Sequence, residues 1–206
     1  MEKKERKRIG MKKVLLIGDS IRKNYEEYVK KRLADVADVY YPYDNGRFCQ
    51  ITLRYFHDWA RILSDDWKFD FDIIHFNSGL WDILRLSNED ECFNNPEQYK
   101  ELLRRIVLRM RYFYPNAKII FALTTKVLEP GFKYGNDIAV RRNSDITKYN
   151  EIAINLFSEM DVEINDLWTL TENCSDSIRS DNVHFETSEG IHILGNAVSD
   201  CIRKYC

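Results

Sequence analysis

Three residues far apart in the chain could together perform acyl transfer. Ser20 ends the tripeptide Gly18-Asp19-Ser20, and Asp181 and His184 lie near the C-terminus. A serine hydroxyl is a weak nucleophile until a base removes its proton, and imidazole titrates near neutral pH. An aspartate can fix the imidazole tautomer and stabilise the imidazolium. Because Asp181 and His184 are three residues apart, both side chains can project from one turn toward a common point.

The elements around Ser20 would place its hydroxyl where ligands bind. Residues 13–17 form an apolar run that predicts a strand, and residues 21–33 have helical spacing. Ser20 therefore lies at a strand-to-helix junction, at the carboxyl end of a sheet, where open α/β folds bind ligands. Its backbone N–H is one of the unpaired donors at a helix start, and it could face a developing negative charge.

The rest of the chain alternates apolar runs with helical stretches, which favours an α/β layered fold with a largely parallel sheet. Predicted strands are 13–17, 36–41, 73–77, 118–123 and 162–165, and predicted helices are 21–33, 53–63, 96–112, 144–158 and 186–205. Asn95 and Pro96 have the chemistry of a helix start. Residues 126–142 predict a loop over one edge of the site. Residues 1–11 predict a disordered basic arm, and residues 12–206 predict a single domain.

Composition places the chain among ordinary soluble globular proteins. It has 206 residues, 44% hydrophobic and 31% charged, and a formal net charge of -2. This balance gives no electrostatic basis for binding nucleic acid or an anionic membrane, and no apolar run is long enough to span a bilayer. The five cysteines form no CxxC pair or metal-ligand spacing, and residues 1–10 lack the apolar segment of a secretory signal. We therefore expect free thiols and a cytoplasmic protein.

Four segments together resemble the SGNH hydrolases, also called the GDSL esterase family. They are Ile17-Gly18-Asp19-Ser20, Asp44-Asn45-Gly46, the segment from Asn77 to Asp82, and Asp181-Asn182-Val183-His184. Phe185, followed five residues later by Gly190 and a helix, also looks like the family, and the resemblance covers nearly all of residues 12–205. It implies a flavodoxin-like three-layer α/β/α sandwich with a mainly parallel sheet. It also implies a Ser20–His184–Asp181 triad with Ser20 as nucleophile.

The resemblance implies an oxyanion hole with three donors. Two would be the backbone N–H of Ser20 and that of a glycine after the second strand, whose position Gly46 fits. The third would be an asparagine side chain after the third strand. The family's third block is Gly-x-Asn-Asp, whereas this chain has Gly79-Leu80-Trp81-Asp82, so Trp81 stands in the asparagine's place. Asn77 can supply an amide instead, and Trp81 Nε1–H is the competing donor.

The remaining histidines have no acid placed as Asp181 is for His184. His75 alternates within the third predicted strand and fits a core position, and packing explains His57 and His192. Asp19 is expected to organise hydrogen bonds around the nucleophile turn, and Asp82 to have a similar supporting role.

These features predict a serine esterase acting on short-acyl esters, acetyl above all, with carbohydrate esters as one substrate class. Tyr43, Phe48 and Trp81 could stack on a sugar ring, and Arg47 could meet an anionic group. The scheme needs no metal or organic cofactor, and the sequence indicates no oligomeric state. The alternative is a catalytically weak or inactive binding protein with an altered oxyanion hole, which Trp81 favours. A phosphate-binding flavodoxin-like protein ranks lower, because the chain lacks a glycine-rich phosphate loop.

Overall fold

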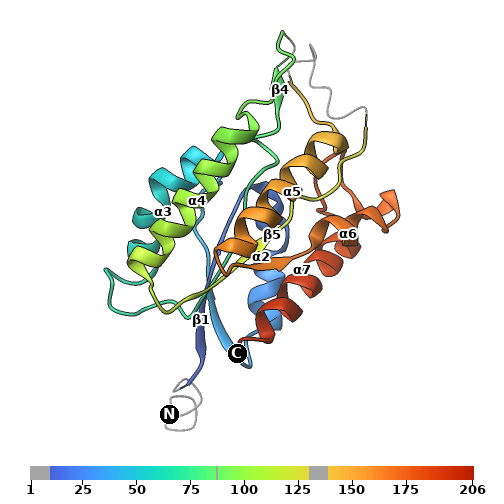
Figure 1. Ribbon diagram of the computed structural model, residues 1–206. Helices are drawn as coiled ribbons and strands as arrows, with labels where there is room; N and C mark the ends of the chain where they lie inside the picture. Colours follow the sequence, from blue (N-terminus) through green and yellow to red (C-terminus); the bar gives the residue numbers. More distant parts are fainter. Residues whose placement is uncertain (1–9, 87, 130–138) are drawn as a thin grey trace.

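Five parallel strands form the central sheet of this protein. The computed structural model describes residues 10–86, 88–129 and 139–206. The strands are β1 (Lys12–Ile17), β2 (Ala37–Tyr40), β3 (Ile73–Asn77), β5 (Lys118–Ala122) and β7 (Glu163–Asn165), in the order β2-β1-β3-β5-β7 (Figure 1). Ile17 pairs with Phe76, so Gly18, which follows β1, and Asn77, the last residue of β3, lie side by side at the carboxyl edge of the sheet. The predicted parallel α/β sheet is confirmed.

Helices cover both faces of the sheet. Helix α2 (Ser20–Arg32) packs against α7 (Ser188–Arg203), while α4 (Pro96–Phe113) packs against both α3 (Cys49–Leu63) and α5 (Asn143–Glu159) (Figure 1). The helix start predicted at Asn95 and Pro96 is confirmed, and it forms a capping box: the Asn95 side chain accepts from the Gln98 N–H, and the Gln98 side chain accepts from the Asn95 N–H. The chain therefore has the three-layer α/β/α arrangement.

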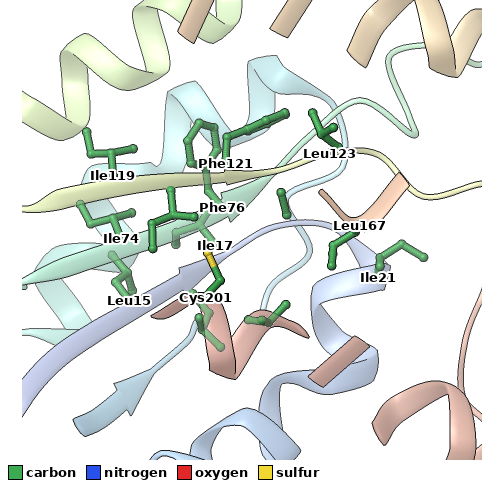
Figure 2. Packing of buried hydrophobic residues seen from close by; sticks show 14 of the residues in the cluster. Leu15, Ile17, Ile21, Ile74, Phe76, Ile119, Phe121, Leu123, Leu167 and Cys201 are labelled. Carbon is green, nitrogen blue, oxygen red and sulfur yellow. The ribbon is translucent and has the colours of Figure 1, made fainter. Parts of the chain in front are cut away.

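The sheet and its helices share one hydrophobic core. Val14, Leu15, Leu16 and Ile17 of β1 have no exposed surface, as expected for a central parallel strand covered on both faces. Figure 2 shows side chains from β1, β3 and β5 packed together, with Ile21, Leu123 and Leu167 near one another. These last three lie just beyond the carboxyl ends of β1, β5 and β7. The core thus extends to the edge of the sheet where the nucleophile turn lies.

Helix α3 begins four residues earlier than the sequence predicts, at Cys49 instead of residue 53. Its N-cap, Phe48, has no side chain that can cap a helix. The Cys49 N–H instead donates to Asp82 Oδ1 at 3.1 Å, and this carboxylate comes from the segment after β3. The local sequence therefore holds no start signal, because a residue 33 positions away supplies it.

Several short elements were not predicted. Strands β4 (Arg85–Leu86) and β6 (Ala139–Val140) form an antiparallel pair, and α6 (Leu167–Glu172) and a 3-10 turn (Asp176–Ile178) precede the histidine segment. The predicted loop 126–142 therefore ends in a strand, and its residues 130–138 lie outside the described residues, as do residues 1–9 of the predicted arm. Among the described residues, no helix is long and apolar enough to cross a membrane.

Candidate active site

Ser20, His184 and Asp181 form a continuous hydrogen-bonded row. Ser20 Oγ lies 2.8 Å from His184 Nε2, and His184 Nδ1 lies 2.8 Å from Asp181 Oδ2. A carboxylate only accepts hydrogen bonds, so Nδ1 carries the proton and Nε2 is left to accept the serine hydroxyl proton. This is the arrangement that a histidine base requires. Ser20 is the first residue of α2, and His184 precedes α7, which packs against α2.

The three-residue spacing of Asp181 and His184 has a structural reason. Asp181 Oδ1 accepts from the backbone N–H groups of Val183 and His184, at 2.6 and 2.7 Å, which closes a tight turn. The other oxygen, Oδ2, is then placed against the imidazole of His184. Burial acts to raise the pKa of Asp181, but the hydrogen bonds from His184 and Val183 outweigh it and hold the pKa below its usual value. The carboxylate stays charged, as a partner for imidazolium must.

Asp19 organises the nucleophile turn, as the sequence predicts. It is the N-cap of α2: its Oδ1 accepts from the Ile21 N–H at 2.9 Å and from Asn77 Nδ2 at 2.8 Å. Asp19 is 1% exposed, and burial raises its pKa despite these two donors. The Asn77 amide is therefore fixed beside the turn that carries Ser20. One of its two hydrogens is used, and the other is available for a further acceptor.

Gly18 is required where it stands, because a Cβ added there would lie 1.9 Å from Asn77 Oδ1. Gly46 makes a similar close approach from the loop after β2, where an added Cβ would lie 2.9 Å from the Gly18 carbonyl oxygen. The Gly46 N–H donates to this carbonyl at 2.8 Å. In this conformation it faces the protein's own backbone, and its oxyanion role stays a prediction.

Arg22 is a residue of the site that the sequence analysis missed. Its side chain has no exposed surface and forms an ion pair with Glu26. Its guanidinium donates to the carbonyls of Pro42, at 3.0 Å, and Asp44, at 2.5 Å. Burial lowers the pKa of Arg22 to about 10, so the group remains cationic at neutral pH.

Arg22 therefore ties the loop after β2 to the helix that begins with the nucleophile. A signal for it does exist in the sequence. Arg22 precedes Tyr25 and Val29 by three and seven positions, which places it on the buried face of α2.

Aromatic side chains surround the segment after β3. The Trp81 ring meets that of Phe48 edge-on, at 5.3 Å between ring centroids, and Phe48 stacks on Phe93 at 4.1 Å. The guanidinium of Arg141 lies 5.8 Å from the Trp81 ring centroid, and its Nε donates to the Leu80 carbonyl at 2.6 Å.

Two residues predicted to contact substrate are exposed. Arg47 lies on the loop after β2, with a left-handed φ of 42° and its N–H bonded to Asn45 Oδ1. Tyr43 is 94% exposed, and Lys23 lies over its ring.

The other histidines occupy structural positions. His75 is fully buried in β3 and receives a hydrogen bond from Asn165 Nδ2 at 3.1 Å, so the predicted core position is confirmed. His57 accepts from Arg109 on the far side of α3, and His192 stacks on Tyr28. Of the four histidines, all within the described residues, His184 is the one that is hydrogen-bonded to Ser20. No cluster of three or more metal-ligating side chains occurs in the described part of the chain.

A small cavity lies beside the nucleophile turn. Its volume is about 10 Å³, room for about one water molecule. Two polar residues, two threonines and apolar side chains line it: Asp19, Asn77, Thr124, Thr125, Ile21, Leu80, Leu123 and Leu167. A larger hollow of about 350 Å³ runs along β2, and none of the residues predicted for the active site lines it. We place the candidate site at the row Ser20–His184–Asp181, because a site is recognised by groups that could react and by their geometry more than by volume.

Comparison with solved structures identifies the fold. An acetyl xylan esterase, AlAXEase, superposes with a TM-score of 0.69 at 14% identity, over 92% of this chain and 99% of that one. The carbohydrate acetylesterase Est24 from Sinorhizobium meliloti gives 0.64 at 15% identity, over 95% and 100%. A member of the lipolytic protein G-D-S-L family from Veillonella parvula DSM 2008 gives 0.64 at 18%, over 93% and 98%.

The chain has the fold of the lipolytic G-D-S-L proteins. The three-layer sandwich that the sequence resemblance implied is thereby confirmed. No protein-family model matches the sequence, and no curated protein matches it.

Proposed function

We propose that this protein, which has the G-D-S-L fold, is a serine esterase that hydrolyses short-acyl esters, acetyl above all. The observation that carries the proposal is the row Ser20–His184–Asp181, with both hydrogen bonds at 2.8 Å. Ser20 Oγ attacks the ester carbonyl while His184 takes its proton, and His184 then protonates the leaving alcohol. Water repeats the sequence on the acyl-enzyme and releases the acid. Every step uses side chains, backbone and water.

The oxyanion would be stabilised by the Ser20 N–H and the Asn77 amide. Asn77 donates one amide hydrogen to Asp19, and this hydrogen bond fixes the direction of the other amide hydrogen. The donor is therefore already oriented before the oxyanion forms, and no reorganisation is needed in the transition state. Gly46 would contribute if its N–H left the Gly18 carbonyl, a shift confined to the loop after β2. Trp81 stays the competing side-chain donor.

Two observations support a short acyl group on a carbohydrate. The cavity beside the turn holds about 10 Å³, which suits a methyl group and not a long chain. Phe48, Trp81 and Arg141 form an aromatic and cationic rim that could contact a sugar ring. The structures of an acetyl xylan esterase and a carbohydrate acetylesterase on the same fold agree with this substrate class.

The test is hydrolysis of p-nitrophenyl acetate, butyrate and octanoate by the wild type and by Ser20→Ala. We expect turnover to be fastest on acetate and to fall at least about 10³-fold in Ser20→Ala and in His184→Ala. His192→Ala is the matched control, because this histidine is exposed on α7 and contacts Tyr28 instead of Ser20. Near wild-type turnover by Ser20→Ala would remove Ser20 from the mechanism.

A second candidate is a binding protein that has lost catalysis. Two observations favour it: the Gly46 N–H is engaged by Gly18, and Trp81 stands in the place of the family's asparagine. Labelling by a fluorophosphonate separates the two. An esterase is labelled at Ser20, whereas a protein without an activated serine is not.

A further inference from the structure

An arginine-lined groove lies between α3 and α4, on the opposite side of these helices from the sheet. Its volume is about 320 Å³, at the low end of the range of ligand clefts. Gln50, Leu53 and Arg54 come from α3, and Leu102, Arg105 and Arg109 come from α4. The two leucines give it an apolar floor, and the three arginines give it a cationic rim.

The positive charge of this groove is only partly neutralised. Arg54 pairs with Asp58 at 3.0 Å. Arg109 Nη2 donates to His57 Nδ1 at 2.9 Å, which is a neutral partner, since a protonated Nδ1 could not accept. Arg109 Nε is buried without a hydrogen-bond partner. Arg105 is exposed and has no salt bridge within the described part of the chain.

Nearby carboxylates do not cancel the excess. Asp58 is shared between Arg54 and His57, whose Nε2 lies 3.1 Å from it. Glu101 on α4 forms its ion pair with Arg104, a residue outside the groove, at 2.8 Å, and it interacts with Arg105 only through longer-range electrostatic attraction. Two of the three arginines that line the groove therefore lack a carboxylate partner, which favours an anionic ligand.

Side-chain contacts link the groove to the rim of the candidate active site. Gln50, at its upper end, exchanges two hydrogen bonds with Asn94, at 2.6 and 3.0 Å. The neighbouring Phe93 stacks on Phe48, and Phe48 packs against Trp81. A series of side-chain contacts, one of them through the buried Asn94, thus joins the segment after β3 to the groove that contains Arg105 and Arg109.

We propose that this groove binds the carboxylate groups of an acidic polysaccharide whose acyl ester lies at Ser20. The proposal rests on the esterase function above and names its substrate class. Arg105 and Arg109 are one helical turn apart, about 6 Å along α4, so they can meet carboxylates of neighbouring sugar units. Leu53 and Leu102 supply the apolar surface on which a sugar ring rests. An acidic protein segment would satisfy the charge as well, but the contacts that link Gln50 to Trp81 favour a substrate chain that reaches Ser20.

Binding is measured by calorimetry on Ser20→Ala, with an unacetylated oligogalacturonate as the probe and a neutral xylan oligosaccharide as its counterpart. We expect the acidic oligomer to bind more tightly, and its affinity to fall between about 50 mM and about 300 mM NaCl as screening increases. Arg105→Gln/Arg109→Gln in this background should weaken it about tenfold, as loss of two partly exposed ion pairs predicts.

The matched control is Lys100→Gln/Arg104→Gln, which removes two positive charges from α4 outside the groove. Equal weakening by both double variants would overturn the proposal, because it would reduce the effect to net charge. Arg105→Gln alone, at an exposed position, should still weaken binding about threefold without the folding risk of changing Arg109.

Two further outcomes overturn the glycan assignment. One is poly-L-glutamate binding more tightly than oligogalacturonate, which would make the groove a site for acidic protein. The other is Ser20-dependent hydrolysis of p-nitrophenyl acetate with no binding of oligogalacturonate, which would leave the esterase function intact. Absence of Ser20-dependent hydrolysis would defeat the esterase function instead. In enzyme with Ser20 intact, the groove variant should lower kcat/KM for acetylated polygalacturonate about tenfold more than for p-nitrophenyl acetate.

Discussion

At the scale of single residues, the site depends on one buried carboxylate that does no chemistry itself. Asp19 Oδ1 accepts from the first turn of α2 and from Asn77, so one atom joins the nucleophile turn to the end of β3. Gly18 leaves room for the Asn77 side chain, because a methyl group at Gly18 would overlap it. The position of the Asn77 amide is therefore set by Gly18 and Asp19, which follow a different strand, β1.

This arrangement predicts that Asn77→Ala lowers kcat for p-nitrophenyl acetate about 10²- to 10³-fold with little change in KM, since the donor acts in the transition state. Trp81→Phe removes the competing N–H but keeps a ring against Phe48. The fall in kcat should be at least about tenfold smaller in this variant than in Asn77→Ala. Steady-state kinetics on both variants decide between the donors. The reverse ranking would make Trp81 the third donor.

At the scale of elements, α2 does more than present Ser20. Arg22 on its buried face binds the carbonyls of Pro42 and Asp44, and thereby holds the loop that carries Gly46. Its ion pair with Glu26 is largely buried, with side chains 0% and 13% exposed. Removing one member of such a pair is costly, whereas replacing both with apolar residues is often neutral.

We therefore expect Arg22→Met to lower the free energy of unfolding by about 3 to 5 kcal/mol, and Arg22→Met/Glu26→Leu to recover much of that loss. The double variant should still have a reduced kcat, because the loop after β2 has lost its anchor. Denaturant unfolding and p-nitrophenyl acetate kinetics give the two readouts. Wild-type kcat in a stable double variant would show that Arg22 serves only the fold.

The sequence allowed those elements to be predicted whose signals are local. The buried runs of β1 and β3, the helix start at Asn95 and Pro96 and the turn of Asp181 with His184 each depend on residues a few positions apart. The start of α3 was predicted wrongly because its cap is Asp82, from another segment. Strands β4 and β6 have two residues each, and the Arg85–Asp145 ion pair helps to join the segments that carry β4 and α5.

The candidate site likewise has a part that could be predicted from the sequence and a part that could not. The meeting of Ser20, Asp181 and His184 follows from where their motifs stand in an alternating α/β chain. The hydrogen bond from Gly46 to Gly18 could not be predicted, since it depends on the path of a loop. Arg22 was passed over because an arginine on a helix usually faces water.

At the scale of the whole molecule, the fold contains a neutral buried histidine whose protonation opposes folding. Burial lowers the pKa of His75 to about 3. Asn165 donates to its Nε2, and Nδ1 has no hydrogen-bond partner. The unfolded chain takes up this proton near pH 6.5, while the folded protein does so only near 3. His75 therefore has no effect on the free energy of unfolding above about pH 6.5, and it lowers this free energy progressively as the pH falls from 6.5 toward 3.

At pH 5 this single group should reduce the free energy of unfolding by about 2 kcal/mol relative to neutral pH. His75→Gln keeps an acceptor for Asn165 and has no titrating ring. Between neutral pH and pH 5, the free energy of unfolding of this variant should therefore fall by about 2 kcal/mol less than that of the wild type. Urea unfolding at about pH 7.5 and about pH 5 measures the difference. Identical pH dependence in the two proteins would mean that His75 does not carry this effect.

Ser20 and His184 meet across 164 positions of the chain. Ser20 begins α2 and His184 precedes α7, and these two helices pack together. Contacts of such long range close late in folding, because the entropy of joining distant segments must first be offset by the rest of the structure. A partly folded chain with its sheet in place but α7 undocked would hold a serine without a base. The hydrolytic activity proposed for this protein would thus be tied to the completion of the fold, and partly folded species would remain chemically silent.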